Sequence, residues 1–128
     1  MPPKTPKPTE AELEVLSVLW SRGPSTVRQV HEALSPRRDV GYTTILKIMQ
    51  LMADKGLVKR DTSQRTHVYA PADSSSHTRR RLVRDLIDRA FDGSARGLIL
   101  EALASKRPTK AETAELRALL DELEGKGR

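Results

Sequence analysis

The chain has 128 residues, of which 37% are apolar and 31% charged, so it fits one domain or a small domain with an appendage. No apolar run approaches the roughly 18 residues of a membrane-spanning helix, and the first ten residues, MPPKTPKPTE, lack the apolar centre of a secretory signal, so we expect no membrane insertion. The absence of cysteine excludes disulfides, thiolate metal sites and a cysteine nucleophile, and it fits a cytoplasmic protein.

The net charge of +6 is concentrated in one segment. From Arg37 to Arg81 the chain carries ten Lys or Arg residues against four acids, so this segment accounts for the whole net charge. A local basic surface on a neutral background is typical of a nucleic-acid-binding protein. The alternative is an ordinary solvated surface on an arginine-rich protein.

The N-terminal part predicts an arm and a helix. Residues 1–8 hold four prolines and two lysines, which is typical of a disordered arm. Thr9 and Glu12 have the spacing of a capping box, so a first helix should run from about Glu10 to Ser21 before a Gly-Pro pair ends it. Leucines and valines repeat along one side of this helix together with Trp20, which we expect to anchor the core.

Two more helices are expected next. Thr26 and Gln29 form a second capping box, which opens a short helix that a Ser-Pro pair closes. The third helix starts near Tyr42 or Thr43, and Gly56 ends it as a left-handed cap. Its apolar residues recur every three or four positions and share one face: Ile45, Ile48, Met49 and Met52.

A β-hairpin follows the third helix. Leu57–Arg60 and Thr66–Ala70 are rich in Val, Thr and Tyr and flank the polar stretch DTSQR. The order of these elements predicts a mainly α fold with a small β-hairpin wing, a winged helix-turn-helix that occupies residues 9–72. The segment Ser25-Thr26 is a candidate for a short third strand, which the sequence leaves open.

The polar face of the third helix and the basic hairpin suit duplex DNA, with the helix in the major groove and the hairpin along the backbone or in a minor groove. Lys47 can reach a phosphate or a guanine edge, and hydroxyls at helix N-termini can donate to phosphate, although capping alone also explains them. For the basic hairpin, the alternative is a merely solvated surface. The candidate DNA-binding residues are Ser25, Thr26, Tyr42, Thr43, Thr44, Lys47, Gln50, Arg60 and Arg65.

Residues 73–128 predict a C-terminal helical dimerisation tail. Helices are expected from about Ser76 to Asp92, over Ala95–Ser105, and after a third capping box that begins at Thr109. Three helices with wide apolar stripes make a domain below the size that usually folds alone, so a second copy of the chain is the simplest partner. The residues expected to bury in this homodimer are Leu82, Leu86, Phe91, Leu98, Leu103, Leu116, Leu119, Leu120 and Leu123.

The order of motifs resembles one family. The segments LSVLW, STVRQVHEAL, YTTILKIMQLMADKGLV and HVYAP are similar to those of the penicillinase and methicillin-resistance repressors, over nearly the whole chain. The resemblance implies a dimeric bacterial repressor of β-lactam-resistance or related stress genes, and we expect its operator to be an inverted repeat. It also implies that repression ends when the protein is cleaved after a membrane-bound antibiotic sensor is triggered, so a protease and a sensor are implied partners.

The chain departs from this pattern in two respects. The related copper-responsive repressors end in a metal-binding cysteine cluster, which this chain lacks, so we expect no copper and no other metal site. Members cleaved on induction resemble one another around an Asn-Phe bond in the fifth helix. The candidate cleavage region here is Glu101-Ala102, within LILEALA.

Other function classes have less support in the sequence. There is no HExxH pair, no GxSxG elbow and no glycine-rich phosphate loop, so we expect neither enzyme activity nor a cofactor. One rival is a winged helix that binds an acidic protein partner instead of DNA. Another is a ligand-responsive DNA-binding regulator, which would need a sizeable apolar pocket between the tail helices.

Overall fold

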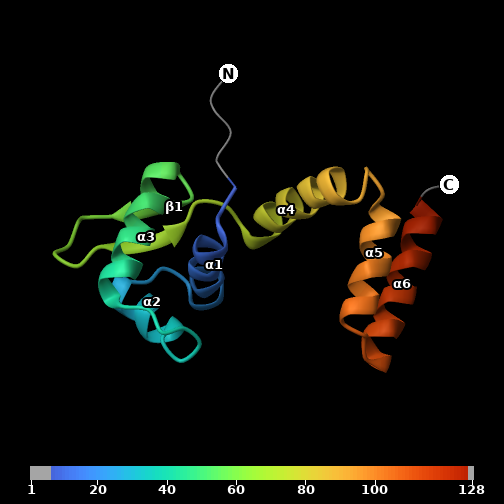
Figure 1. The fold of residues 1–128 in the computed structure, drawn as a ribbon, viewed down its shortest axis with the longest axis horizontal. Helices are drawn as coiled ribbons and strands as arrows, with labels where there is room; N and C mark the ends of the chain where they lie inside the picture. The colour runs from blue at the N-terminus through green and yellow to red at the C-terminus, as the bar shows by residue number, and fades with distance from the viewer. Residues whose placement is uncertain (1–6, 127–128) are drawn as a thin grey trace, which may run out of the picture. The chain divides into compact units, whose positions relative to one another are not determined.

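A computed structural model describes residues 7–126. It divides into two compact units, Met1–Leu82 and Val83–Arg128. Figure 1 shows helices α1, α2 and α3 grouped with the β1–β2 hairpin in the first unit. The elements in chain order are α1 (Glu10–Arg22), α2 (Val27–Leu34), α3 (Tyr42–Lys55), β1 (Val58–Asp61), β2 (Val68–Pro71), α4 (Ser75–Ala90), α5 (Ala95–Ser105) and α6 (Lys110–Lys126).

The predicted helix starts are confirmed by their caps. Thr9 accepts a hydrogen bond from the Glu12 amide while the Glu12 side chain accepts one from the Thr9 amide, and Thr26 and Gln29 repeat this arrangement at the start of α2. Both boxes satisfy amides that a helix start leaves unpaired. The predicted arm, residues 1–8, falls mostly outside the described residues.

The hairpin is shifted by one or two residues from its predicted position. Gly56 has a left-handed backbone (φ 81°), and the Leu57 amide donates to the Met52 carbonyl over 2.9 Å. These contacts form a Schellman cap, so Leu57 belongs to the end of α3 and β1 begins one residue later. The antiparallel register pairs Arg60 with Tyr69. The segment Ser25-Thr26, which the sequence left open as a third strand, contributes a single isolated bridge from Ser25 to Tyr69.

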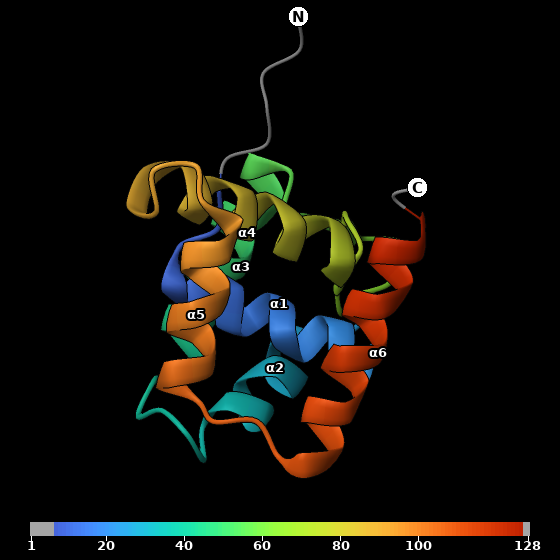
Figure 2. The same cartoon turned by 90° about the vertical axis from the view of Figure 1, so that its right-hand side faces the viewer.

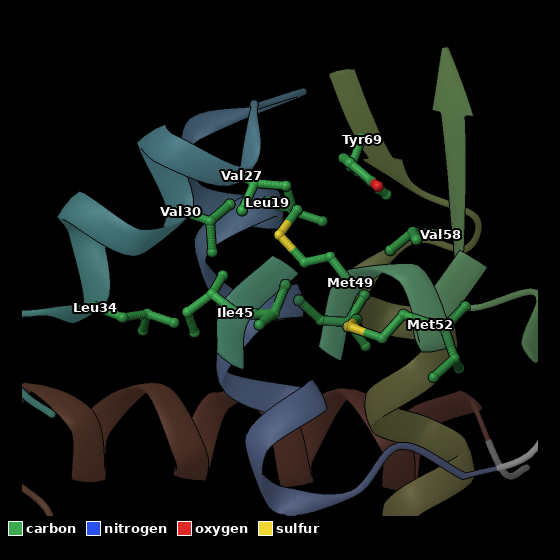
Figure 3. Close-up of a cluster of buried hydrophobic side chains, with 12 residues drawn as sticks. Leu19, Val27, Val30, Leu34, Ile45, Met49, Met52, Val58 and Tyr69 are labelled. Carbon is green, nitrogen blue, oxygen red and sulfur yellow. The ribbon is translucent and has the colours of Figure 1, made fainter. Parts of the chain in front are cut away.

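One hydrophobic core holds together the first unit, which we call the winged unit. Ile45, Met49 and Met52 are buried on one face of α3, where they meet side chains from α1, α2 and the hairpin (Figure 3). The core therefore fixes which face of α3 points away from the protein. Its buried members are Val15, Leu16, Leu19, Val27, Val30, Leu34, Ile45, Met49, Met52, Leu57, Val58 and Tyr69.

An ion pair ties α1 to α3. The Lys55 ammonium lies 2.8 Å from Oε2 of Glu12, whose side chain is only 5% exposed. Burial raises the pKa of the Glu12 carboxyl, but hydrogen bonds from Lys55 and Thr9 and the Lys55 charge outweigh it, and the net pKa falls below its ordinary value of 4.5. The same carboxylate caps α1 through the Thr9 amide, so one side chain fixes a helix start and a helix–helix contact.

Trp20 lies at the edge of the core rather than inside it. It is half-buried, its indole N–H donates to the Asp73 carbonyl over 3.2 Å, and the Arg79 guanidinium lies 5.8 Å from the ring centroid. Thr78, on the same turn of α4, is buried. The first turns of α4 therefore pack on α1, and the two units divide within α4, after Leu82.

The tail helices keep their apolar stripes exposed. Figure 2 shows α5 and α6 as separate, oppositely directed helices, and no side chain in the described range 83–125 is buried. Gly97, near the start of α5, makes room for a neighbour, since a Cβ there would lie 3.3 Å from the Phe91 ring. Within residues 7–126, no helix is long and apolar enough to cross a membrane.

Candidate nucleic-acid interface

The face of α3 opposite the core is exposed and mostly polar. We call it the outward face. Lys47 lies at its centre, one turn from Thr43 on one side and next to Gln50 on the other. Thr44 is also exposed on the first turn. The members of the outward face are Thr43, Lys47, Gln50, Leu51 and Asp54.

A groove of about 480 Å³ lies beside the outward face and brings together residues from three separate elements. Tyr42 and Gln50 come from α3, Thr26 from the start of α2, and Arg60 and Arg65 from the hairpin. These are five of the nine predicted DNA-binding residues. Among the polar lining residues, sequence reasoning missed Arg28, Thr66 and His67.

The register of the hairpin explains why Arg60 reaches this groove. Arg60 pairs directly with Tyr69, and opposed residues on antiparallel strands point to the same side of the sheet. Tyr69 is buried towards α2 and α3, so Arg60 shares that side. Lys59 and Asp61 alternate with Arg60 and lie on the other side.

The wing tip is shaped by Asp61. Its carboxylate accepts a hydrogen bond from the Ser63 amide at 2.9 Å, which is an Asx-type turn. Hydrogen bonds from the Ser63 side chain and backbone, together with the nearby His67, hold the pKa of Asp61 below its ordinary value. The turn therefore carries a negative charge near Lys59, and the ribbon side away from the groove is close to neutral.

The two residues at the start of α2 have different environments. Ser25 is 4% exposed, its hydroxyl donates to the Gly23 carbonyl at 2.9 Å, and its backbone bonds to Tyr69. Thr26 is partly exposed and lines the groove while its hydroxyl caps α2. The hydroxyl of Ser25 is thus committed to the fold, whereas Thr26 stands where capping and a phosphate contact are compatible.

His31 connects α2 to the start of α3. Its Nε2 lies 2.8 Å from the Val40 carbonyl, and since a carbonyl only accepts, Nε2 carries the proton. Its ring also meets Tyr42 edge-on, with centroids 6.1 Å apart and planes at 83°. Gly41, the cap of α3, has no side chain to make a capping bond. His31 therefore helps to hold the entry to α3 and the Tyr42 ring.

Part of the basic segment is neutralised within the fold. The Arg38 guanidinium lies 2.6 Å from Glu14 and 3.7 Å from Glu10, on α1. The Lys55 ammonium pairs with Glu12, while the Arg79 guanidinium keeps its charge and lies over the Trp20 ring. The basic surface beside the outward face therefore contains fewer cations than the segment from Arg37 to Arg81.

The other predicted positions lie in the tail. Glu101 and Ala102, the candidate cleavage region, are exposed near the middle of α5. Among the nine residues expected to dimerise, Leu82, Phe91 and Leu98 are half-buried within the chain. The other six are exposed: Leu86, Leu103, Leu116, Leu119, Leu120 and Leu123. In the part of the chain that the structure describes, no three His, Cys, Asp or Glu side chains are grouped to hold a metal ion.

Comparisons with known proteins agree with this architecture. The family model described as penicillinase repressor matches residues 8–122. A transcriptional regulator BlaI from Mycobacterium tuberculosis is 40% identical over 90% of this chain and 83% of its own length. A penicillinase repressor from Bacillus licheniformis is 25% identical over 93% of each chain.

One solved structure is similar to the winged unit. It is the monomeric form of Bacillus licheniformis BlaI in complex with the blaP half-operator, with a TM-score of 0.50 and 29% identity. The match covers 57% of this chain and 89% of that one. The predicted winged helix is therefore confirmed, and the chain belongs to the penicillinase repressor family.

Proposed function

We propose that this protein is a transcriptional repressor that binds an operator in duplex DNA through α3, the start of α2 and the wing. The observation that carries the proposal is the convergence of Thr26, Tyr42, Gln50, Arg60 and Arg65 on one groove beside the exposed Lys47. Polar and cationic groups from three elements meet there without contributing to the core. A related BlaI is known in complex with a half-operator, which supports the same use of this surface.

The geometry suits a division of roles between base and backbone contacts. Lys47 projects from the middle of α3, where a side chain in the major groove can reach guanine O6 and N7. Thr43 and Thr44 lie on the first turn, where hydroxyls and free amides can donate to a phosphate. Arg60 and Arg65 on the hairpin are placed for phosphates of the flanking backbone, which position the protein but carry no sequence information.

The tail supports assembly as a homodimer. Six predicted interface leucines are exposed, and helices of this length with wide apolar stripes need a surface to cover them. A second copy offers the same stripes, as a two-fold interface requires. In this proposal residues 9–72 form the DNA-binding module and residues 73–128 the dimerisation tail, and the operator is an inverted repeat that presents one half-site to each module.

Induction by cleavage remains part of the proposal at Glu101-Ala102. Both residues are exposed, which favours access by a protease. Both are also helical, and a protease binds its substrate as an extended strand, so α5 must open locally before the bond is cut.

A ligand-responsive mechanism has less support. The groove between α5 and α6, about 570 Å³, is lined by Lys106, Arg107, Glu112 and Glu115 as well as leucines. A small-molecule pocket is usually mostly apolar with few charged groups. The groove therefore does not match the apolar pocket that such a regulator needs.

Binding of the full-length protein to DNA tests the proposal. The probes are duplexes from the region upstream of its own gene and scrambled duplexes of the same composition, titrated at several salt concentrations. We expect specific, salt-dependent binding, and Lys47→Ala should cost about 1–3 kcal/mol on the specific duplex only. Equal affinity for both duplexes, or binding that salt leaves unchanged, would favour the protein-interaction module instead.

A further inference from the structure

Leu51 is an apolar side chain in an otherwise polar setting. It is 45% exposed and lies in the C-terminal half of α3. Among the described residues up to Leu82, the large hydrophobic side chains that are exposed are Leu51 and Tyr42, and both belong to α3. The remaining exposed apolar side chains lie in the tail, from Val83 onward, where a dimer would cover them.

The position of Leu51 on α3 places it on the outward face. It follows Lys47 by one turn, and residues four apart on a helix are neighbours. Ile45, Met49 and Met52 point into the core from the opposite side, as Figure 3 shows. A partner that contacts Lys47 on the outward face will therefore also contact Leu51.

The part of the outward face from Thr43 to Leu51 fits within the major groove. Thr43 and Leu51 are eight residues apart, which at about 1.5 Å per residue is about 12 Å along the helix axis. A recognition helix lies in the major groove, which at about 12 Å wide admits it. Successive base pairs are about 3.4 Å apart, so when Thr43 lies over one end of the contact, Leu51 lies over base edges about three to four base pairs further along the groove.

The chemistry of Leu51 selects among those base edges. The 5-methyl of thymine is the apolar group that the major groove presents, whereas cytosine presents an amino group and guanine two acceptors. A leucine covers a methyl well, but it leaves an amino or carbonyl group desolvated and unpaired. We propose that Leu51 contacts a thymine methyl in each half-site and so requires an A·T pair at that position. This inference rests on the proposed operator binding and adds a base preference to it.

Deletion of single methyl groups from the DNA tests the contact. The probe is the duplex that the full-length protein recovers from a random-sequence pool, with each thymine replaced in turn by deoxyuridine, which pairs normally but lacks the methyl. Wild type, Leu51→Ala and Leu51→Met are compared. Alanine is a strong helix former and Leu51 is exposed, so neither substitution should disturb the fold.

At one thymine per half-site, the wild type should lose about fourfold in affinity, the change expected for one buried methyl-sized group. Leu51→Ala should already be weaker on the unmodified duplex and lose nothing more at that position, while Leu51→Met should behave as the wild type. The inference would be overturned if the loss of affinity from Leu51→Ala and the loss from removing the methyl were additive. It would also be overturned if Leu51→Ala bound the unmodified duplex as tightly as the wild type. Recovery of no preferred sequence by the wild type would instead overturn the proposed operator binding.

Discussion

Because they lie on opposite sides of the hairpin, the adjacent cations Lys59 and Arg60 should contribute very differently to DNA binding. Arg60 lines the groove beside α3, whereas Lys59 lies on the opposite side of the same strand with Asp61. We expect Arg60→Ala to weaken DNA binding and Lys59→Ala to leave it nearly unchanged. Both side chains are exposed, so each substitution should alter the free energy of unfolding by no more than about 0.5 kcal/mol.

The size of the effect follows from the number of phosphate contacts. Arg28, Arg60 and Arg65 are the cations that line the groove on each protomer, so the proposed dimer offers six phosphate contacts. Each phosphate neutralised contributes about 0.9 to the slope of the logarithm of the binding constant against that of salt, which predicts a slope of about −5. Arg60→Ala removes two contacts per dimer and should flatten the slope by about 1.8.

Fluorescence titration of a labelled operator duplex between about 50 and 200 mM salt would measure this slope, over the range where such binding changes most. Lys59→Ala is the matched control, because its charge on the far side of the ribbon is screened over about 10 Å at 0.1 M salt. If both variants flatten the slope equally, or if Arg60→Ala leaves it unchanged, the assignment of the ribbon side that faces DNA is wrong.

Two further predictions concern stability and assembly. Lys55→Ala leaves the buried Glu12 carboxylate without its cation, so urea unfolding at pH 7 should show a loss of about 2 kcal/mol, below the usual cost of a broken buried pair because Lys55 is one-third exposed. Since the pKa of Glu12 is lowered on folding, this stabilisation is present above its unfolded value of 4.5 and is lost as the pH falls through the lower folded value. If the difference in free energy of unfolding between the wild type and Lys55→Ala were the same at pH 3 as at pH 7, the assignment would be contradicted. A chain that ends after Leu82 should stay folded, sediment as a monomer at micromolar concentration and bind DNA weakly; a truncated chain that still dimerises would place the interface in the winged unit.

Local sequence was sufficient for the elements and their ends. Capping boxes at Thr9, Thr26 and Thr109 involve residues three positions apart, so they act before any tertiary contact forms. The apolar spacing along α3 likewise identified its buried face and, by exclusion, its outward face. The winged-helix fold follows from the order of these elements, which is why motif order and family resemblance agree.

Tertiary structure alone decided which side chains share a surface. Nothing near Ser25 in the sequence indicates that Tyr69 covers it, and nothing near Arg38 indicates its pairing with Glu14. The groove depends on hairpin register, which aims Arg60 inward and Lys59 outward, and a shift of one residue would reverse them. Periodicity reports the face of one element, because neighbours along a helix or strand fix its geometry. Contacts between elements depend on how distant segments pack, so charges that are adjacent in the sequence become separated between ion pairs, the core edge and the exposed surface beside α3.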